Sequence, residues 1–126
     1  MDYEIRYEQG VQIVELNGSL DMNSAKEARM VLRESVQTLP ELLLIDLSGL
    51  RYLKSTGYQS LYELAGRARE LKTPVAIVGP PPEIATIMRI FRLTDLFPVY
   101  ESVSEAVEEM LPLPIEEGGF SNPPRV

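Results

Sequence analysis

The chain has 126 residues, 44% of them hydrophobic, which is enough for one domain that buries its own core. It contains no cysteine and no histidine, so disulfides, thiol chemistry, a serine–histidine–aspartate triad and histidine-ligated zinc are excluded. The formal net charge of −7 argues against nucleic-acid phosphates as the main partner. No stretch is apolar enough to span a membrane and the N-terminus lacks a signal-peptide pattern, so we expect a cytoplasmic protein.

The first part of the chain predicts a β-hairpin followed by a helix. Residues 3–7 alternate apolar and charged side chains, and residues 11–16 are rich in β-branched ones, as is typical of two paired strands. Gln9 and Gly10 between them form a turn signal. Ser24, with Glu27 three residues later, predicts a capping box at the start of the helix.

The central stretch predicts a buried strand that leads into a long helix. Residues 42–45 are continuously apolar, which is typical of a strand covered on both faces. A helical spacing of apolar residues runs from 61 to 71. The helix begins near Ser55, Thr56 and Gly57. Free backbone N–H groups and the helix dipole favour negative charge at such a position.

Further elements follow the central helix. Residues 75–78 predict a short apolar strand, the apolar spacing from 84 to 91 predicts a helix, and residues 97–100 predict an edge strand. Ser102 and Glu105 predict a second capping box, at the start of the last helix.

The predicted order of elements is β-β-α-β-α-β-α-β-α. Strands that alternate with helices predict an α/β fold with a mixed central sheet, an N-terminal hairpin followed by parallel strands, and about four helices. We assign residues 1–111 to this single domain. Residues 112–126 are rich in proline, glycine and glutamate and predict a disordered C-terminal tail.

Four segments, in this order and at these separations, make the chain resemble the STAS domain, named for sulfate transporters and anti-sigma factor antagonists. The resemblance covers roughly residues 3–111 and is strongest to the free-standing bacterial anti-sigma factor antagonists. The matching segments are residues 17–21 after the second strand, residues 45–48 together with 53–57, residues 87–96, and residues 100–106.

The resemblance implies a phosphorylation switch. In the antagonist family, the serine after the motif aspartate is phosphorylated by a partner that is both a serine kinase and an anti-sigma factor. The implied phosphoacceptor is Ser55, with Thr56 as the second choice, and the implied partners are that kinase and, for reversal, a phosphatase. The unphosphorylated protein would bind the anti-sigma factor and so regulate transcription. The predicted partner-binding residues are Asp21, Lys54, Ser55, Thr56 and Gly57, together with Arg89 and Arg92, which flank Phe91.

The chain departs from the family at Lys54, which stands where the family has aspartate. An ammonium group cannot accept a proton or a hydrogen bond, so it cannot orient the acceptor hydroxyl as a carboxylate would. Its charge would instead attract a phosphate on Ser55 or Thr56. The departure leaves the fold expectation intact and weakens the expectation of a kinase substrate. Gly57 is expected where another chain or a nucleotide must approach closely.

Three functional hypotheses follow. In the first, phosphate on Ser55 changes the binding surface while the fold persists. In the second, the chain is a scaffold or interaction subunit of a larger signalling or transport assembly, and Ser55 and Thr56 only cap a helix. The third, an enzyme, is disfavoured, because without histidine or cysteine catalysis would need paired carboxylates or a perturbed lysine. The only carboxylates near the motif are Asp21, favoured as a loop cap or partner contact, and Asp46, favoured as a strand-end residue hydrogen-bonded to the following turn.

We therefore expect no catalytic residue, no metal and no cofactor. The identity of the sigma factor or kinase and the oligomeric state do not follow from the sequence.

Overall fold

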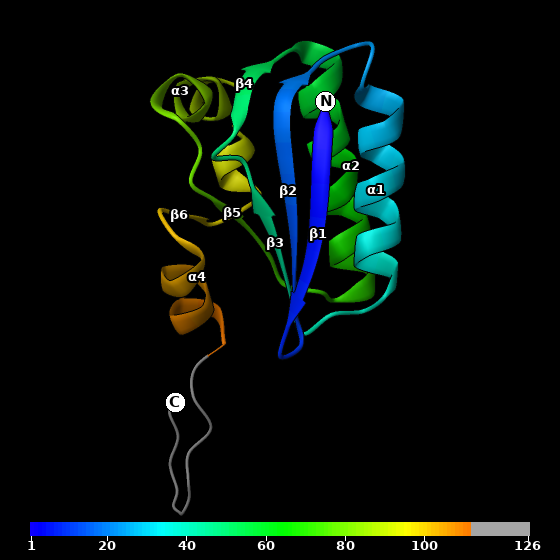
Figure 1. Cartoon of the computed structure of the whole chain (residues 1–126), viewed down its shortest axis with the longest axis vertical. Helices are drawn as coiled ribbons and strands as arrows, with labels where there is room; N and C mark the ends of the chain where they lie inside the picture. The colour runs from blue at the N-terminus through cyan, green and yellow to red at the C-terminus, as the bar shows by residue number, and fades with distance from the viewer. Residues whose placement is uncertain (112–126) are drawn as a thin grey trace, which may run out of the picture.

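The structure of the chain is a computed structural model, and it describes residues 1–111. These residues form a central sheet with helices on both faces (Figure 1). The elements are β1 (Asp2–Glu8), β2 (Val11–Leu20), α1 (Ala25–Gln37), β3 (Leu42–Asp46), β4 (Leu50–Leu53), α2 (Ser55–Leu71), β5 (Val75–Val78), α3 (Pro82–Ile90), the 3-10 helix η1 (Leu93–Asp95), β6 (Val99–Tyr100) and α4 (Val103–Met110). The predicted tail, residues 112–126, lies outside the described residues.

The sheet is mixed, as the sequence predicts. Its strand order is β1-β2-β3-β5-β6, with β1 antiparallel to β2 and the later pairs parallel. Gln9 and Gly10 join the hairpin with φ angles of 54° and 87°, both positive, as a two-residue turn of type I′ requires. The hairpin prediction is therefore confirmed.

The strand β4 is an element that the predicted order lacks. β2 pairs with β3 over Val11–Glu15, and its last residues pair instead with β4, with an irregular register between Gly18 and Ser19. Within β4, Leu50 and Leu53 are buried while the two residues between them are exposed. This pattern lacks the strict alternation that identifies a strand in a sequence.

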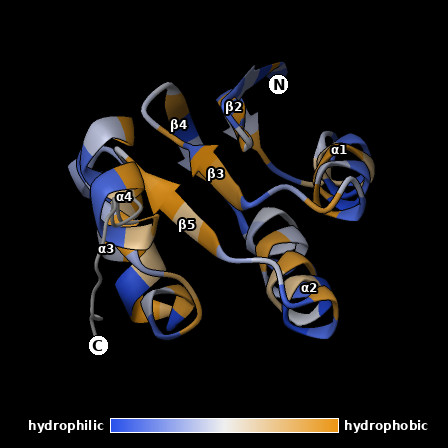
Figure 2. Cartoon of the chain, turned by 90° about the horizontal axis from the view of Figure 1, so that it is seen from below, coloured by the Kyte–Doolittle hydropathy of each residue, from blue (hydrophilic) through white to orange (hydrophobic). Residues whose placement is uncertain are grey.

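The core lies in two layers, one on each face of the sheet. Figure 2 shows β3 and β5 hydrophobic along their length, between α1 and α2 on one side and α4 on the other. The larger layer joins α1 and α2 to the sheet and includes Val14, Ile45 and Leu61, all fully buried. The smaller layer joins α4 to the opposite face through Ala106, Ile13 and neighbouring side chains. No helix within residues 1–111 is both long enough and apolar enough to cross a membrane.

The two predicted capping boxes have different outcomes. Ser102 accepts a hydrogen bond from the Glu105 N–H (3.1 Å), and the Glu105 carboxylate accepts one from the Glu101 N–H (2.8 Å), so the box at α4 is confirmed with its second bond one residue earlier than usual. The prediction of a capping box at α1 is wrong. No side chain caps α1, because the Ser24 hydroxyl donates instead to the Ser19 carbonyl at 2.8 Å.

Candidate functional site

The predicted site lies where β2 and β4 end and α2 begins. The Lys54 N–H donates to the Leu20 carbonyl at 2.9 Å, which ties the last residue of β2 to the start of α2. Gly57, in the first turn of α2, is buried against the same carbonyl group. A side chain there would bring a Cβ within 2.7 Å of the Leu20 carbonyl carbon. The loop that carries Asp21 is therefore held beside the first turn of α2.

The close approach at Gly57 is made by the chain itself. The sequence interpretation attributed this glycine to an approaching partner or nucleotide, but the backbone of Leu20 already occupies the space. The absence of a side chain at Gly57 is thus required by packing between β2 and α2.

Ser55 is the first residue of α2, and its side chain is exposed, whereas Thr56 is half-buried. The residue before the helix, Lys54, has an extended backbone, and its carbonyl accepts hydrogen bonds from the N–H groups of Gly57 and Tyr58 at 2.9 and 3.0 Å. No side chain caps α2. The interpretation of Ser55 and Thr56 as helix caps is therefore wrong, and the Ser55 hydroxyl is open to solvent.

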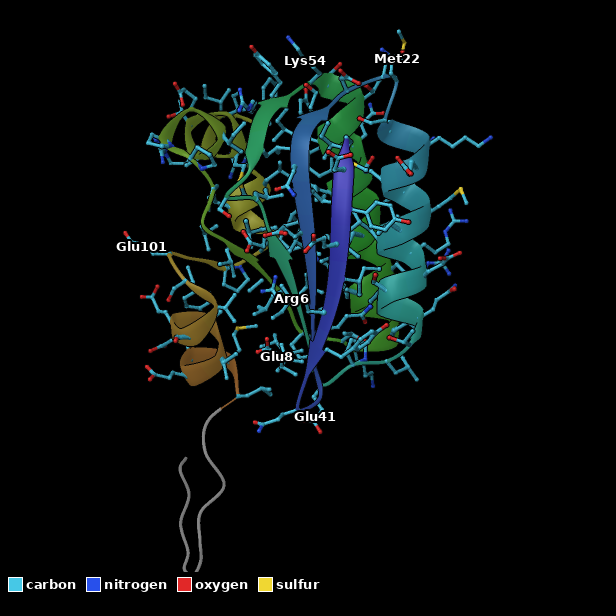
Figure 3. The ribbon with its side chains drawn as sticks, viewed as in Figure 1. Arg6, Glu8, Met22, Glu41, Lys54 and Glu101 are labelled. Atoms are coloured by element: carbon cyan, nitrogen blue, oxygen red, sulfur yellow. The ribbon has the colours of Figure 1, made fainter. Side chains whose placement is uncertain are left out.

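Lys54 is exposed, and its ammonium nitrogen lies 5.6 Å from the centre of the Tyr52 ring. This is a cation–π distance, so the positive charge has a favoured position over the Tyr52 ring. Figure 3 shows Lys54 projecting from the same end of the molecule as Met22, whose side chain is 75% exposed. A cation and an exposed methionine thus flank the first turn of α2.

The two carboxylates near the site have structural partners. The Asp21 carboxylate accepts hydrogen bonds from the N–H groups of Asn23 (3.0 Å) and Ser24 (3.3 Å), which makes it the predicted loop cap. The Asp46 carboxylate accepts one from the Ser48 N–H at 2.9 Å, as predicted for a strand-end residue. Both carboxylates shape loops at the edge of the site. Within residues 1–111, no group of three or more metal-binding side chains is positioned to hold an ion.

The end of α3 packs against the first turns of α2. The rings of Tyr58 and Phe91 stack with their centres 4.4 Å apart, and the Tyr62 hydroxyl donates to the Phe91 carbonyl. The predicted partner-binding residues Arg89 and Arg92 lie on either side of this contact, and both are exposed. They therefore belong to a surface that adjoins the first turns of α2.

The local partners of these arginines are also exposed. Arg92 forms an ion pair with Asp95 (2.8 Å), and Arg89 donates to the Thr86 hydroxyl at 3.3 Å. Ile90 between them is 65% exposed. Sequence reasoning missed Ile90 and Met22 as surface residues. The sequence signal for each is that it is an apolar residue outside the regular spacing of the buried apolar residues around it.

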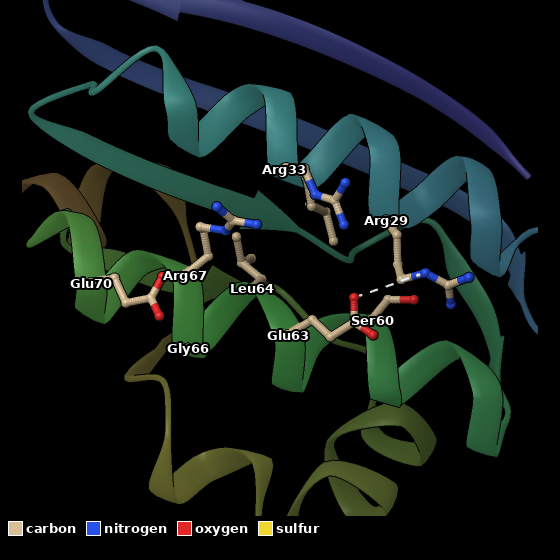
Figure 4. Close-up of a pocket in the computed structure, with 9 residues that line it drawn as sticks. Arg29, Arg33, Ser60, Glu63, Leu64, Gly66, Arg67 and Glu70 are labelled. Carbon is tan, nitrogen blue, oxygen red and sulfur yellow. Dashed lines mark ion pairs between the residues drawn. The ribbon is translucent and has the colours of Figure 1, made fainter.

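Two grooves also went unpredicted. One, of about 610 Å³, runs between β4 and α3 and is lined by residues that include Tyr52, Lys54 and Ile87. The other, of about 340 Å³, lies between α1 and α2 (Figure 4). Its lining includes three arginines and the buried Ser60 hydroxyl, which has no hydrogen-bond partner within the described residues; the lining residues are Arg29, Leu32, Arg33, Ser60, Glu63, Leu64, Gly66, Arg67 and Glu70.

Comparison with known proteins agrees with the resemblance seen in the sequence. The family model of the STAS domain matches residues 2–106. The chain belongs to the STAS domain family. A search of curated protein sequences returns no significant match to this STAS protein.

Several solved structures share its fold. The STAS protein is similar to an anti-sigma factor antagonist from Mycobacterium paratuberculosis, with a TM-score of 0.79 and 23% identity over 86% of this chain and 92% of that one. The antagonist SpoIIAA in its unphosphorylated form gives a TM-score of 0.71 and 15% identity, covering 90% of this chain and 100% of that one. A sulfate transporter family protein from Wolinella succinogenes gives a TM-score of 0.71 and 18% identity, covering 82% of this chain and 86% of that one. At these identities the similarity establishes the fold.

Proposed function

We propose that this STAS-domain protein is an anti-sigma factor antagonist of the cytoplasm, a protein-binding regulator of transcription that is switched by phosphorylation at Ser55. The observation that carries the proposal is the exposure of the Ser55 side chain. Its side chain is exposed at the first position of α2, and no side chain caps that helix. The hydroxyl is therefore accessible to a kinase. The proposed partner is an anti-sigma factor that is also a serine kinase, and a phosphatase would reverse the phosphorylation.

The start of α2 can accept the charge of a phosphate. Phosphorylation adds about −1.5 to −2 charges, and the N-terminal end of a helix carries a partial positive charge. The N–H groups of Gly57 and Tyr58 donate to the Lys54 carbonyl. The N–H groups of Ser55 and Thr56 come too early in α2 to reach any carbonyl group of the helix. Those two N–H groups are positioned to donate to phosphate oxygens.

Lys54 supports retention of the phosphate and does not assist its transfer. Lys54 is exposed and directly precedes Ser55, so its flexible side chain could pair with a phosphate there. It cannot take the proton from the Ser55 hydroxyl, so the kinase would have to supply the base. Any group that orients or deprotonates the Ser55 hydroxyl would therefore come from the kinase.

The surface around Ser55 has the composition of a protein-binding site. Two exposed apolar side chains belong to neighbouring segments: Met22 lies on the loop after β2, and Ile90 at the end of α3, which packs against α2. Exposed cations lie among them, including Lys54 and Arg89. Exposed apolar residues rimmed by charge suit a partner protein, and a phosphate in their midst would reverse the local charge.

Intact-mass spectrometry tests the proposal. The protein is incubated with ATP and the anti-sigma kinase encoded nearest to it, beside the variants Ser55→Ala and Thr56→Ala. We expect one added phosphate that is lost only in Ser55→Ala. Transfer to Thr56 instead would move the switch by one residue, and the absence of any added mass would refute the kinase-substrate role.

A second candidate is a STAS subunit that works without phosphorylation, as a scaffold of a signalling or transport assembly. Two observations favour it: Lys54 in place of the family aspartate, and the fold similarity to a sulfate transporter family protein. A Ser55→Glu variant separates the two. Undiminished binding to the purified partner supports the scaffold, whereas lost binding supports the switch.

A further inference from the structure

We infer that the outer edge of β1 is an interface between two copies of this chain, joined by antiparallel pairing of β1 with β1. The strand is seven residues long, Asp2–Glu8, and lies at the end of the strand order. Within residues 1–111, only β2 pairs with it. Figure 1 shows β1 in front of β2, at one edge of the sheet.

The hairpin turn determines which backbone groups of β1 face outward. Glu8 and Val11 flank the two-residue turn, so they form a pair that exchanges both hydrogen bonds. Pairing alternates along an antiparallel ladder, so every second residue of β1 points its N–H and C=O toward β2. The residues between them, Tyr3, Ile5 and Tyr7, therefore present their N–H and C=O to the open edge.

A twofold axis at Ile5 satisfies all of these groups at once. In that register Ile5 lies opposite Ile5 of the second copy, and Tyr3 lies opposite Tyr7, each as a hydrogen-bonded pair. The same three side chains are 40%, 41% and 67% exposed for Ile5, Tyr3 and Tyr7. Pairing would bring them into one continuous apolar row across the two copies.

Charge on the opposite face selects the same register. With the axis at Ile5, Glu4 of each copy lies opposite Arg6 of the other, in non-hydrogen-bonded pairs whose side chains are closest. A slip by two residues in one direction would bring Glu4 opposite Glu4, and in the other direction Arg6 opposite Arg6. The like-charged pair that remains, Asp2 with Glu8, lies at the two ends of the ladder, where pairing frays.

The alternating charges also limit the strength of the interface. A stable interface buries about 1,200–2,000 Å². One seven-residue edge supplies less than that, so we expect a dimer that dissociates on dilution. The interface uses β1 alone and none of the residues around Ser55, so it is independent of the proposed function.

Charge exchange across the pair tests the interface. Arg6→Glu brings two carboxylates together at both symmetric contacts, and Glu4→Arg brings two cations together. Each single variant should associate about tenfold to a hundredfold more weakly than the unaltered chain. A mixture of the two single variants should restore association, because each Glu–Glu chain then meets an Arg–Arg chain. The double variant should also restore it. Arg51→Glu, an exposed change on β4, is the matched control.

Sedimentation equilibrium of the full chain over a wide concentration range measures the association. Hydrogen exchange gives a second readout that needs no variant: the amides of Tyr3, Ile5 and Tyr7 should gain protection as concentration rises, while those of Glu4 and Arg6 are protected throughout. A monomer at every concentration would overturn the inference. Association that Arg6→Glu leaves unchanged, or single variants that fail to associate when mixed, would overturn it as well.

Discussion

Gly57 offers the sharpest test of how the site is built. Replacing it with alanine adds one methyl group at a point where the backbone of β2 already lies against α2. That methyl carbon would lie 2.7 Å from the Leu20 carbonyl carbon and 2.8 Å from its Cγ. The carbonyl cannot move away freely, because it accepts the Lys54 N–H at 2.9 Å. The substitution must therefore displace α2 from β2 or break that hydrogen bond.

Two opposing terms determine the size of the effect at Gly57. Alanine is favoured over glycine in a helix by about 0.5–1 kcal/mol. Forcing an extra carbon into a packed site costs about 1–3 kcal/mol, and more when the neighbour is rigid backbone. Loss of the Lys54–Leu20 hydrogen bond would add about 1 kcal/mol. We expect Gly57→Ala to lower the free energy of unfolding by about 1–3 kcal/mol.

Gly66 supplies a matched control in the same helix. A Cβ at Gly66 would meet no atom within 4 Å, so Gly66→Ala should raise the free energy of unfolding by about 0.5–1 kcal/mol. Urea unfolding followed by circular dichroism measures both variants. Opposite signs for the two changes are the expected result. A Gly57→Ala protein as stable as the unaltered chain would refute the packing argument at the site.

Three further changes test the structure at separate points. Leu61→Ala empties a fully buried position in the larger core layer, and thermal and urea unfolding should show a loss of about 2–5 kcal/mol. Ser102→Ala removes the cap of α4 and should cost about 0.5–2 kcal/mol, whereas Ser104→Ala, an exposed change in the same helix, should leave the urea midpoint nearly unchanged. Ser24→Ala leaves the Asp21 N–H and the Ser19 carbonyl without their hydroxyl partner, and should lower the free energy of unfolding by about 1–3 kcal/mol. A smaller loss of stability than that caused by Ser102→Ala would contradict the assignment of Ser24 as a loop anchor.

The sequence predicts most of the fold because its strands carry strong local signals. The apolar run at residues 42–45 lies in β3 (Leu42–Asp46), and the turn at Gln9 and Gly10 has the backbone that its position requires. The strand β4 escapes prediction because it exists only through its neighbour. It pairs with the end of β2, beyond the point where β3 has separated from it. Such a strand depends on a long-range partner that no local pattern reveals.

The position of the site is predictable, but its internal contacts are not. A strand followed by Ser55 and Gly57 indicates where a helix begins. The partner of Gly57 is Leu20, far away in the chain, so the reason for the glycine appears only when β2 and α2 are side by side. The hydroxyl of Ser24 was misassigned for the same reason, since its nearest acceptor is in the preceding strand. Pairings of this kind come from the folded sheet.

The contacts that hold the site fit the proposed phosphorylation as a switch of charge and not of shape. The first turn of α2 is held by the Lys54–Leu20 hydrogen bond and by the close packing of Gly57, while Ser55 itself projects into solvent. A phosphate on Ser55 can therefore reverse the local charge without displacing the contacts that hold the turn. Gly57→Ala and Ser55→Glu separate these two properties, because the first disturbs the frame at constant charge and the second changes charge on an intact frame. A partner that discriminates Ser55→Glu far more strongly than Gly57→Ala reads the charge of this surface.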